Sequence, residues 1–181
     1  MLKDERLLDP ELEAFLAAGE PPVYFGFGSI SAPQGLSEAM IQSARSLGRR
    51  AILLRGWADL TLLDNEPDCI AIGEVNHQAL FKRVAAIVHH GGAGTTHAAT
   101  RGGAPQILIP QHYDQYYWAG RVEQLGIGTA HPPSTPTVDS LTSALEQVLQ
   151  PDVIARAQSI ADEIRTDGTL IAAQRLISTA M

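Results

Sequence analysis

The stretch "AAIVHHGGAGTTHAAT" (residues 85–100) combines three local signals that decide the fold class. It begins with an apolar run, passes through a turn rich in glycine, and ends in an alanine-rich segment with a high propensity for helix. An apolar run that does not alternate with polar residues indicates a strand that is covered on both faces. The stretch therefore predicts a buried strand that leads through a tight turn into a helix.

The same order of signals repeats along the chain. Segments of helical period, such as "LSEAMIQSARSLG" (36–48), separate short β-prone runs, and three further helices are expected after residue 137. The β-prone runs are residues 23–27, 51–55, 69–72, 85–89, 106–109 and, more weakly, 128–131. Strands that alternate with helices predict an α/β fold, a Rossmann-like doubly wound parallel sheet of about six strands with helices on both faces.

Composition limits the class of protein. With 181 residues, of which 45% are hydrophobic and 18% charged, the chain is expected to form one domain. A net charge of −7 argues against a broad surface for nucleic acid or an anionic membrane. A single cysteine, and the lack of a signal segment or long apolar run, favour a soluble cytoplasmic protein. Residues 1–20 resemble an interdomain linker that Pro21 and Pro22 end, so residues 21–181 are expected to be the domain proper.

Loops that follow the strands carry the unusual residues. In an open parallel sheet, ligands bind at the carboxyl ends of the strands. The loops there are "GFGSIS" (26–31), "HHGGAGTTH" (89–97) and "PQHYDQYYW" (110–118). We expect these three loops to converge on one cleft.

The loop at residues 89–97 suits a phosphate. Gly91, Gly92 and Gly94 permit positive φ and a close backbone approach, and a helix from about Thr95 would present unpaired N–H groups. The side chain of His90 can donate a hydrogen bond to a phosphate oxygen. The alternative is a tight turn in which the threonine hydroxyls only cap the helix.

Other nucleotide motifs are incomplete. "GFGSIS" holds two of the three glycines of the dinucleotide fingerprint, and Arg55-Gly56-Trp57 stands where an acidic residue would bind ribose. No lysine follows a glycine loop as ATP hydrolysis would require. A nucleoside diphosphate held by two loops therefore fits best. An NAD(P)-dependent oxidoreductase stays open as an alternative, with Arg55 as a partner for a 2′-phosphate.

Histidines near the loop are not expected to bind metal. His89 and His90 are neighbours in a strand and point to opposite faces, and no cysteine pair or aspartate completes a zinc spacing with His97. His97 is expected to pack on the helix near the loop.

The run "GEVNHQALFKRVAAIVHHGGAGTTHAATRGGAPQILIPQHYDQYYWAGRVEQLGIG" (73–128) resembles the donor-binding signature of nucleotide-sugar glycosyltransferases of the two-domain GT-B fold. Bacterial enzymes that glycosylate glycopeptide antibiotic aglycones are the nearest in pattern. The resemblance implies a UDP- or dTDP-sugar donor with no cofactor and no metal. The residues it assigns are Ser29, His90, Gly91, Gly92, Gly94 and Thr95 to the diphosphate, Asp114 and Gln115 to the sugar, and Glu74, Val75 and Asn76 to the nucleobase.

Some positions depart from the pattern or admit a second interpretation. Plant relatives carry a base-stacking tryptophan near Glu74 and a ribose-binding glutamate where Ala98 stands here. Trp57 fits a base or sugar contact and a packing residue equally well. A solvated loop or a helix cap is the alternative for Asp114 and Gln115.

The resemblance also implies a missing partner. In this fold the acceptor pocket and the catalytic base, an aspartate or histidine, lie in an N-terminal domain of similar size. This chain would be the donor half, with no catalytic residue of its own, and would serve an inverting displacement on an acceptor hydroxyl. A non-catalytic interaction module is a further alternative. It predicts exposed apolar area on the cleft face and on the final helix, "LIAAQRLISTA" (170–180).

Overall fold

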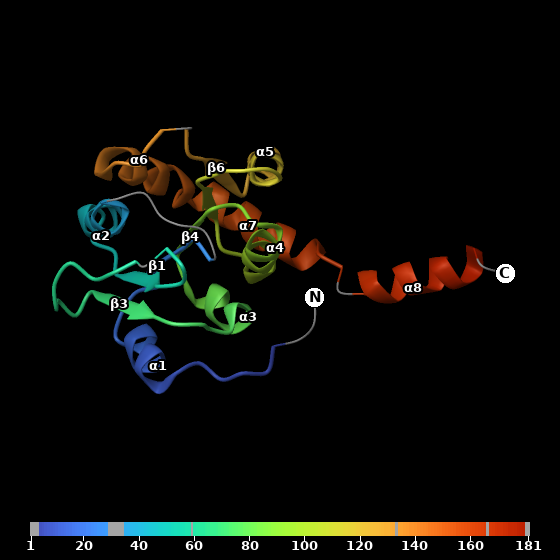
Figure 1. Cartoon of the computed structure of the whole chain (residues 1–181), viewed down its shortest axis with the longest axis horizontal. Coiled ribbons are helices and arrows are strands. Elements are labelled where there is room, and N and C mark those ends of the chain that lie inside the picture. Colours follow the sequence, from blue (N-terminus) through green and yellow to red (C-terminus); the bar gives the residue numbers. More distant parts are fainter. Residues whose placement is uncertain (1–3, 29–34, 59, 133, 166, 180–181) are drawn as a thin grey trace.

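The computed structural model describes residues 4–28, 35–58, 60–132, 134–165 and 167–179. Within these residues six parallel strands form one sheet in the order β3-β2-β1-β4-β5-β6 (Figure 1). The strands are β1 (Val23–Gly26), β2 (Ala51–Leu54), β3 (Cys69–Ile72), β4 (Ala86–His89), β5 (Gln106–Leu108) and β6 (Gly128–Ala130). The predicted α/β fold with a Rossmann-like parallel sheet is confirmed, and each strand lies within its predicted run.

The helices flank the sheet. They are α1 (Pro10–Ala17), α2 (Leu36–Ser46), α3 (His77–Leu80), α4 (Ala93–Gly102), α5 (Gln115–Leu125), α6 (Val138–Val148), α7 (Pro151–Glu163) and α8 (Gly168–Thr179), with a 3₁₀ turn at Phe81–Arg83. The three helices expected after residue 137 are α6, α7 and α8. Helix α4 begins at Ala93, slightly earlier than the expected start near Thr95, because Gly92 takes the N-cap position.

Alternation along the strands divides the core between the two faces of the sheet. Val23 and Phe25 of β1 pack with α2 and α6, whereas Tyr24 between them packs with α1 and α4. A smaller cluster joins β5 to α5 and α7. Both faces are therefore covered, which explains why the strand sequences are apolar at successive positions.

The N-terminal segment packs into this core. Leu8, Leu12 and Leu16 are buried in the cluster that contains Tyr24, and Asp9 caps α1 by accepting a hydrogen bond from Glu11 N. Arg50 donates hydrogen bonds to the backbone carbonyls of Phe15 and Glu20. Residues 8–20, expected to resemble a linker, thus contribute a helix to one layer of the fold.

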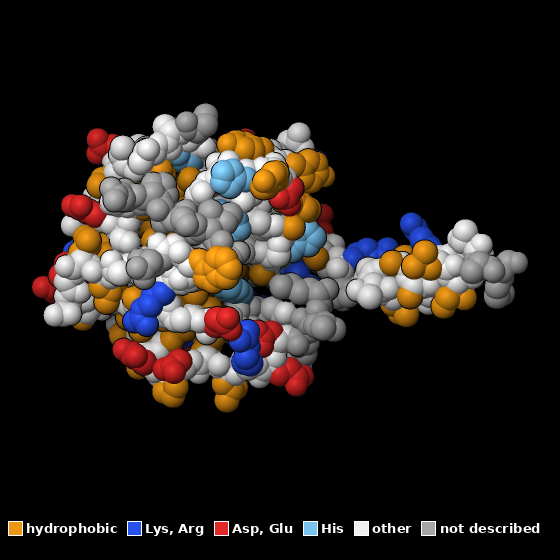
Figure 2. Space-filling model, in the orientation of Figure 1, with side chains coloured by type: hydrophobic (Ala, Val, Ile, Leu, Met, Phe, Trp, Pro, Cys, Tyr) orange, Lys and Arg blue, Asp and Glu red, His pale blue; other side chains and the backbone are white. Residues whose placement is uncertain are grey.

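Helix α8 lies apart from the rest of the fold. Figure 1 shows it extending beyond α7, and none of its described residues is buried. Leu170, Leu176 and Ile177 are 60%, 73% and 64% exposed, and Figure 2 shows hydrophobic and basic side chains along this arm. The exposed apolar area expected for the final helix is present.

Candidate functional site

The site lies where the strand order reverses. β1 and β4 are neighbours in the sheet, yet the chain continues from them to opposite sides, which is the switch point where open α/β sheets bind ligands. Gly28 follows β1 and His90 follows β4 at this point. Ser29, the next candidate in the first loop, lies outside the described residues.

Close backbone contact joins the loops after β1 and β2. Trp57 N donates to Gly28 O at 2.9 Å. Gly56 between β2 and Trp57 has a φ of +49°, and a Cβ there would lie 2.6 Å from Gly28 O. Only glycine permits this approach. The two loops are therefore held together on one side of the switch point.

The ring of His90 occupies space that two glycines leave open. A Cβ on Gly28 would lie 3.3 Å from His90 Cε1, and one on Gly92 would lie 2.5 Å from His90 Nε2. Burial lowers the pKa of His90, although the carboxylate of Asp114 opposes this shift. His90 Nδ1 is buried and has no hydrogen-bond partner among the described residues. A neutral imidazole with an unused polar atom thus faces the switch point.

The three glycines before and within α4 serve different purposes. Of the three, only Gly91 has positive φ, at +92°, so Gly92 and Gly94 do not use the left-handed backbone conformation that glycine permits. Gly92 has an extended backbone and makes room for His90, and Gly94 lies in the first turn of α4. A Cβ on Gly94 would meet nothing within 4 Å. Gly94 therefore leaves the outer surface of the helix start open.

The first turn of α4 has no side-chain cap among the described residues. Thr96 N bonds to Gly92 O, and the Thr96 hydroxyl donates to the same carbonyl, so this hydroxyl does not cap the helix. The N–H groups of Ala93, Gly94 and Thr95 precede the first intrahelical bond. These N–H groups have no hydrogen-bond acceptor among the described residues, and together with the positive end of the helix dipole they suit an anion.

A chain of hydrogen bonds behind the turn fixes its shape. Gly91 N donates to His89 Nδ1 at 3.1 Å, so His89 Nε2 carries the proton and donates to Gln106 Oε1 at 3.1 Å. Gln106 Nε2 then donates to the Thr100 hydroxyl in α4. His89 is fully buried, and burial lowers its pKa to about 3. These buried polar side chains support the turn from the interior of the fold. The ring of His90 lies against Gly28 and Gly92, on the opposite side of the strand from His89, as predicted for neighbouring strand residues.

The loop after β5 packs against the turn. A Cβ on Gly91 would lie 3.2 Å from Gln115 O, so this glycine also permits the two loops to touch. Gln115 is buried, and its Oε1 accepts hydrogen bonds from Gln111 N and His112 N. Asp114 is exposed and accepts a hydrogen bond from Trp118 Nε1 at 3.0 Å. Its side chain does not cap α5. Gln115 therefore shapes the loop, and the carboxylate of Asp114 is close enough to His90 to affect its pKa.

The loop after β3 forms a wall on the other side of the switch point. Glu74 is exposed, Val75 is half-buried and Asn76 is buried. Glu74 and Val75 line two cavities of about 450 Å³ and 350 Å³, and the second cavity is also lined by Gly28, Leu54 and Trp57. The side chain of Trp57 is 78% exposed. The interpretation of Trp57 as a packing residue is therefore wrong, and its ring is open to a ligand.

Comparison with known proteins decides the family. Residues 25–174 match the family described as erythromycin biosynthesis protein CIII-like, C-terminal domain. The chain belongs to this family of CIII-like domains. The predicted resemblance to the donor-binding half of GT-B glycosyltransferases is confirmed. The family decides against the NAD(P)-dependent oxidoreductase alternative.

Relatives of this CIII-like domain act in antibiotic biosynthesis. It is 60% identical over 177 residues to a vancomycin aglycone glucosyltransferase of Amycolatopsis orientalis, a match covering 98% of this chain and 44% of the relative. It is 53% identical over 166 residues to a dTDP-epi-vancosaminyltransferase of the same organism, covering 88% of this chain and 42% of that protein. A crystal structure of the glycosyltransferase of kitacinnamycin matches with a TM-score of 0.76 and 26% identity, over 90% of this chain and 44% of the other. The chain thus spans less than half the length of these relatives.

His97 is the third histidine of the glycine-rich stretch at residues 89–97. His97 of the CIII-like domain lies exposed on α4, with its ring edge-to-face on Trp118 at 5.1 Å. Among the described residues no cluster of three or more histidine, cysteine or acidic side chains is placed to share a metal ion. In the same part of the chain no helix is long and apolar enough to cross a membrane.

Sequence reasoning missed three contributors to the site. Gln106 supports the turn, Asp4 and Arg6 lie beside the β3 loop, and none of them stands in a recognisable motif. A polar Gln106 at the start of an apolar run is a signal that could have indicated a buried partner. The positions of Asp4 and Arg6 depend on contacts with Asn76, some seventy residues away in sequence, and no local pattern predicts them.

Proposed function

We propose that this chain is the donor-binding domain of a glycosyltransferase that moves a sugar from a UDP- or dTDP-sugar to a hydroxyl group of a glycopeptide-like antibiotic aglycone. The observation that supports the proposal is the first turn of α4 at the switch point, which no side chain of the described part of the chain caps and where Gly94 leaves the surface open. The names of the relatives support the nucleotide-sugar and the acceptor class.

The arrangement of the loops determines the orientation that we propose for the bound nucleotide-sugar. The diphosphate binds at the start of α4, held by Gly91, Gly92, Gly94 and Thr95, by His90, and by Ser29 from the first loop. The loop after β5 lies on one side of this point and the loops after β2 and β3 lie on the other. We therefore place the sugar against Asp114 and Gln115, and the nucleoside against Trp57, Glu74, Val75 and Asn76.

The proposed role in the reaction is to stabilise the leaving group. Negative charge builds up on the diphosphate as the bond to the anomeric carbon breaks, and fixed N–H donors stabilise that charge without reorganisation. His90 adds a neutral donor, because burial keeps its pKa low. The domain supplies no general base in this proposal, and the displacement inverts the anomeric centre without a metal ion.

A second domain completes the proposed enzyme. The relatives are more than twice the length that this chain covers, and we propose that their additional half corresponds to the acceptor domain with the catalytic base. None of the described residues of α8 is buried, and its exposed apolar side chains support a missing covering surface. A non-catalytic interaction module would leave the same area exposed, so nucleotide binding must distinguish the two functions.

The test is calorimetric titration of the 181-residue chain with UDP, dTDP and NADP. We expect binding of UDP, dTDP or both, and no binding of NADP. Adding a UDP- or dTDP-sugar and an aglycone should give little transfer by this chain alone. A folded chain that binds neither UDP nor dTDP would refute the donor site, and efficient transfer would refute the need for a second domain.

A further inference from the structure

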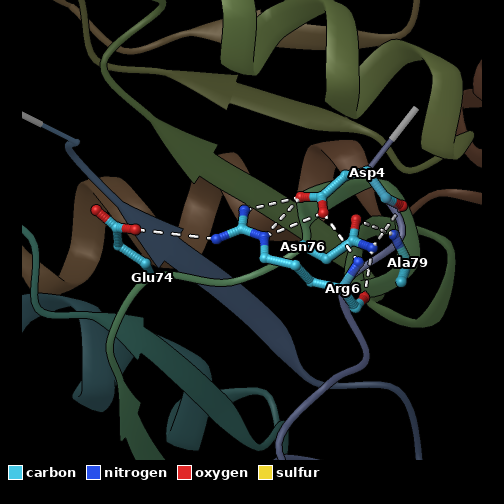
Figure 3. A network of polar contacts seen from close by, with 5 residues as sticks. All are labelled: Asp4, Arg6, Glu74, Asn76 and Ala79. Carbon is cyan, nitrogen blue, oxygen red and sulfur yellow. Dashed lines mark hydrogen bonds and ion pairs between the residues drawn. The ribbon is translucent and has the colours of Figure 1, made fainter. Parts of the chain in front are cut away.

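The segment before α1 forms part of the wall around the β3 loop. Asn76 is 5% exposed, and its Nδ2 donates to Asp4 O at 3.0 Å and to Arg6 O at 2.8 Å (Figure 3). Its Oδ1 accepts from Ala79 N at 3.1 Å and caps α3. All the hydrogen-bonding atoms of this buried side chain are therefore used to join the N-terminal segment to the start of a helix.

Asp4 orients the guanidinium of Arg6. Arg6 Nε donates to Asp4 Oδ1 at 3.0 Å, and Arg6 Nη2 donates to Asp4 Oδ2 at 2.8 Å. Arg6 Nη1 lies 3.9 Å from Glu74 Oε2, too far for a hydrogen bond. Because a guanidinium has five N–H donors in one plane, the Nη1 edge keeps donors for another group. The hydrogen bond with Asp4 raises the pKa of Arg6, so the side chain stays charged.

Arg6 lines both cavities of the nucleoside side. It lies with Glu74, Val75 and Asn76 in the cavity of about 450 Å³, and with Gly28, Trp57 and Val75 in the cavity of about 350 Å³. The second cavity therefore extends from Arg6 to the first loop at the switch point. It combines the apolar side chains of Leu54, Trp57 and Val75 with a planar cation at one end.

We propose that Arg6 is a nucleotide-binding residue that donates hydrogen bonds to a carbonyl oxygen of the pyrimidine base, and that Asn76 is the residue that positions it. The inference rests on the proposed function and extends it to a segment that precedes residues 25–174, the part matched by the family. Uracil and thymine are flat rings with carbonyl oxygens at their edges, which match apolar walls and N–H donors. The diphosphate belongs at α4, on the other side of Gly28, so Arg6 reaches the base end of the ligand.

The first test compares Arg6→Ala with the unchanged chain in titrations with UDP, dTDP and pyrophosphate. We expect Kd for the preferred nucleotide to rise about tenfold or more, since a donor bond from a charged group is lost, while Kd for pyrophosphate stays the same. Arg6→Lys keeps the charge without the planar donors and should recover only part of the affinity. Circular dichroism should show that both variants are folded.

A matched control comes from the other end of the chain. Arg165 is paired with Asp167 in the same way as Arg6 is with Asp4, with Nε and Nη2 donating at 3.0 Å and 2.9 Å. Arg165→Ala removes the same kind of ion pair at a residue that lines neither cavity, so nucleotide affinity should not change. An equal loss in both variants would assign the effect to net charge and overturn the inference.

Asn76→Asp tests the positioning role. Aspartate keeps the oxygen that caps α3 but cannot donate to the carbonyls of Asp4 and Arg6, so the N-terminal segment should be released. We expect nucleotide affinity to fall, and the double variant with Arg6→Ala to lose no more affinity than Arg6→Ala alone. Fully additive losses would mean that Asn76 does not act through Arg6.

The outcomes separate this inference from the proposed function. If the unchanged chain binds neither UDP nor dTDP, the proposed function fails and Arg6 has no base to contact. If the chain binds a nucleotide and Arg6→Ala binds it equally well, only the inference fails. If Arg6→Ala weakens pyrophosphate as much as the nucleotide, Arg6 acts on phosphate and the assignment to the base is overturned.

Discussion

Gly94→Ala should stabilise the unliganded chain and weaken nucleotide binding at the same time. Gly94 lies within α4, where alanine is favoured over glycine by about 0.5 to 1 kcal/mol. A Cβ at this position meets nothing within 4 Å, so no steric cost offsets that gain. For a chain of this length we expect the melting temperature to rise by roughly 1–4 °C, measured by differential scanning calorimetry.

Gly94→Ala should weaken nucleotide binding, although it stabilises the fold, for a steric reason. The added methyl group would stand over the first turn of α4, where a phosphate oxygen must approach the N–H groups closely. Loss of one hydrogen bond to a charged oxygen costs about 1.5–3 kcal/mol, so Kd for UDP or dTDP should rise by roughly tenfold to a hundredfold in calorimetric titration.

Gly120→Ala is the matched control for this experiment. Gly120 lies in α5, and a Cβ there also meets nothing within 4 Å. This variant should gain similar stability and keep the original Kd. A stabilised Gly94→Ala chain that binds nucleotide as well as the original would refute the placement of the diphosphate at α4. A destabilised chain would refute the argument that the space at Gly94 is open.

Three further predictions follow from the site. Burial lowers the pKa of His89 to about 3, whereas the unfolded chain binds a proton at this residue near its ordinary pKa of about 6.5. Lowering the pH below about 6.5 therefore favours the unfolded chain. Between about pH 7.5 and 5.5 the free energy of unfolding should fall by roughly 1.4 kcal/mol through this group. Urea unfolding at both pH values should show a smaller loss in His89→Gln, and an equal loss would contradict the buried neutral ring. Trp57→Ala should raise Kd for UDP or dTDP about tenfold and leave pyrophosphate binding unchanged in the same titrations. Asp114→Ala should bind free UDP normally and bind a UDP-sugar several-fold more weakly; equal losses would make Asp114 a structural residue.

The fold could be predicted because its signals are local. Each strand is an apolar run, and each long helix shows its own spacing, as in α2, where Leu36, Met40 and Ile41 are buried. The parallel order follows from the alternation of strands and helices. The role of the first twenty residues could not be predicted in this way, because α1 is recognised as part of the core only when Leu12 and Leu16 meet Tyr24.

The site was predictable as a set of loops but not as a set of contacts. The glycines of the turn look equivalent in the sequence, yet Gly91 provides positive φ, Gly92 makes room for His90 and Gly94 leaves a surface open. These differences depend on neighbours that come from other elements. The buried pair of His89 and Gln106 likewise forms across two strands, so neither residue alone reveals its partner.

The strand order alone would fit a dinucleotide-binding domain, and the loops explain why we propose a different position for the phosphate in this chain. A dinucleotide site needs a helix that begins directly after β1, so that its N-terminus meets the pyrophosphate. In this chain α2 begins only at Leu36, well after β1 ends at Gly26, whereas α4 begins at Ala93, close behind the end of β4 at His89. The short strand-to-helix turn therefore follows β4 and not β1 in this chain. A phosphate bound there has β5 and Asp114 on one side and the cavity of Trp57 and Arg6 on the other. That arrangement leaves room for a sugar on one side and a nucleoside on the other, as a nucleotide-sugar requires.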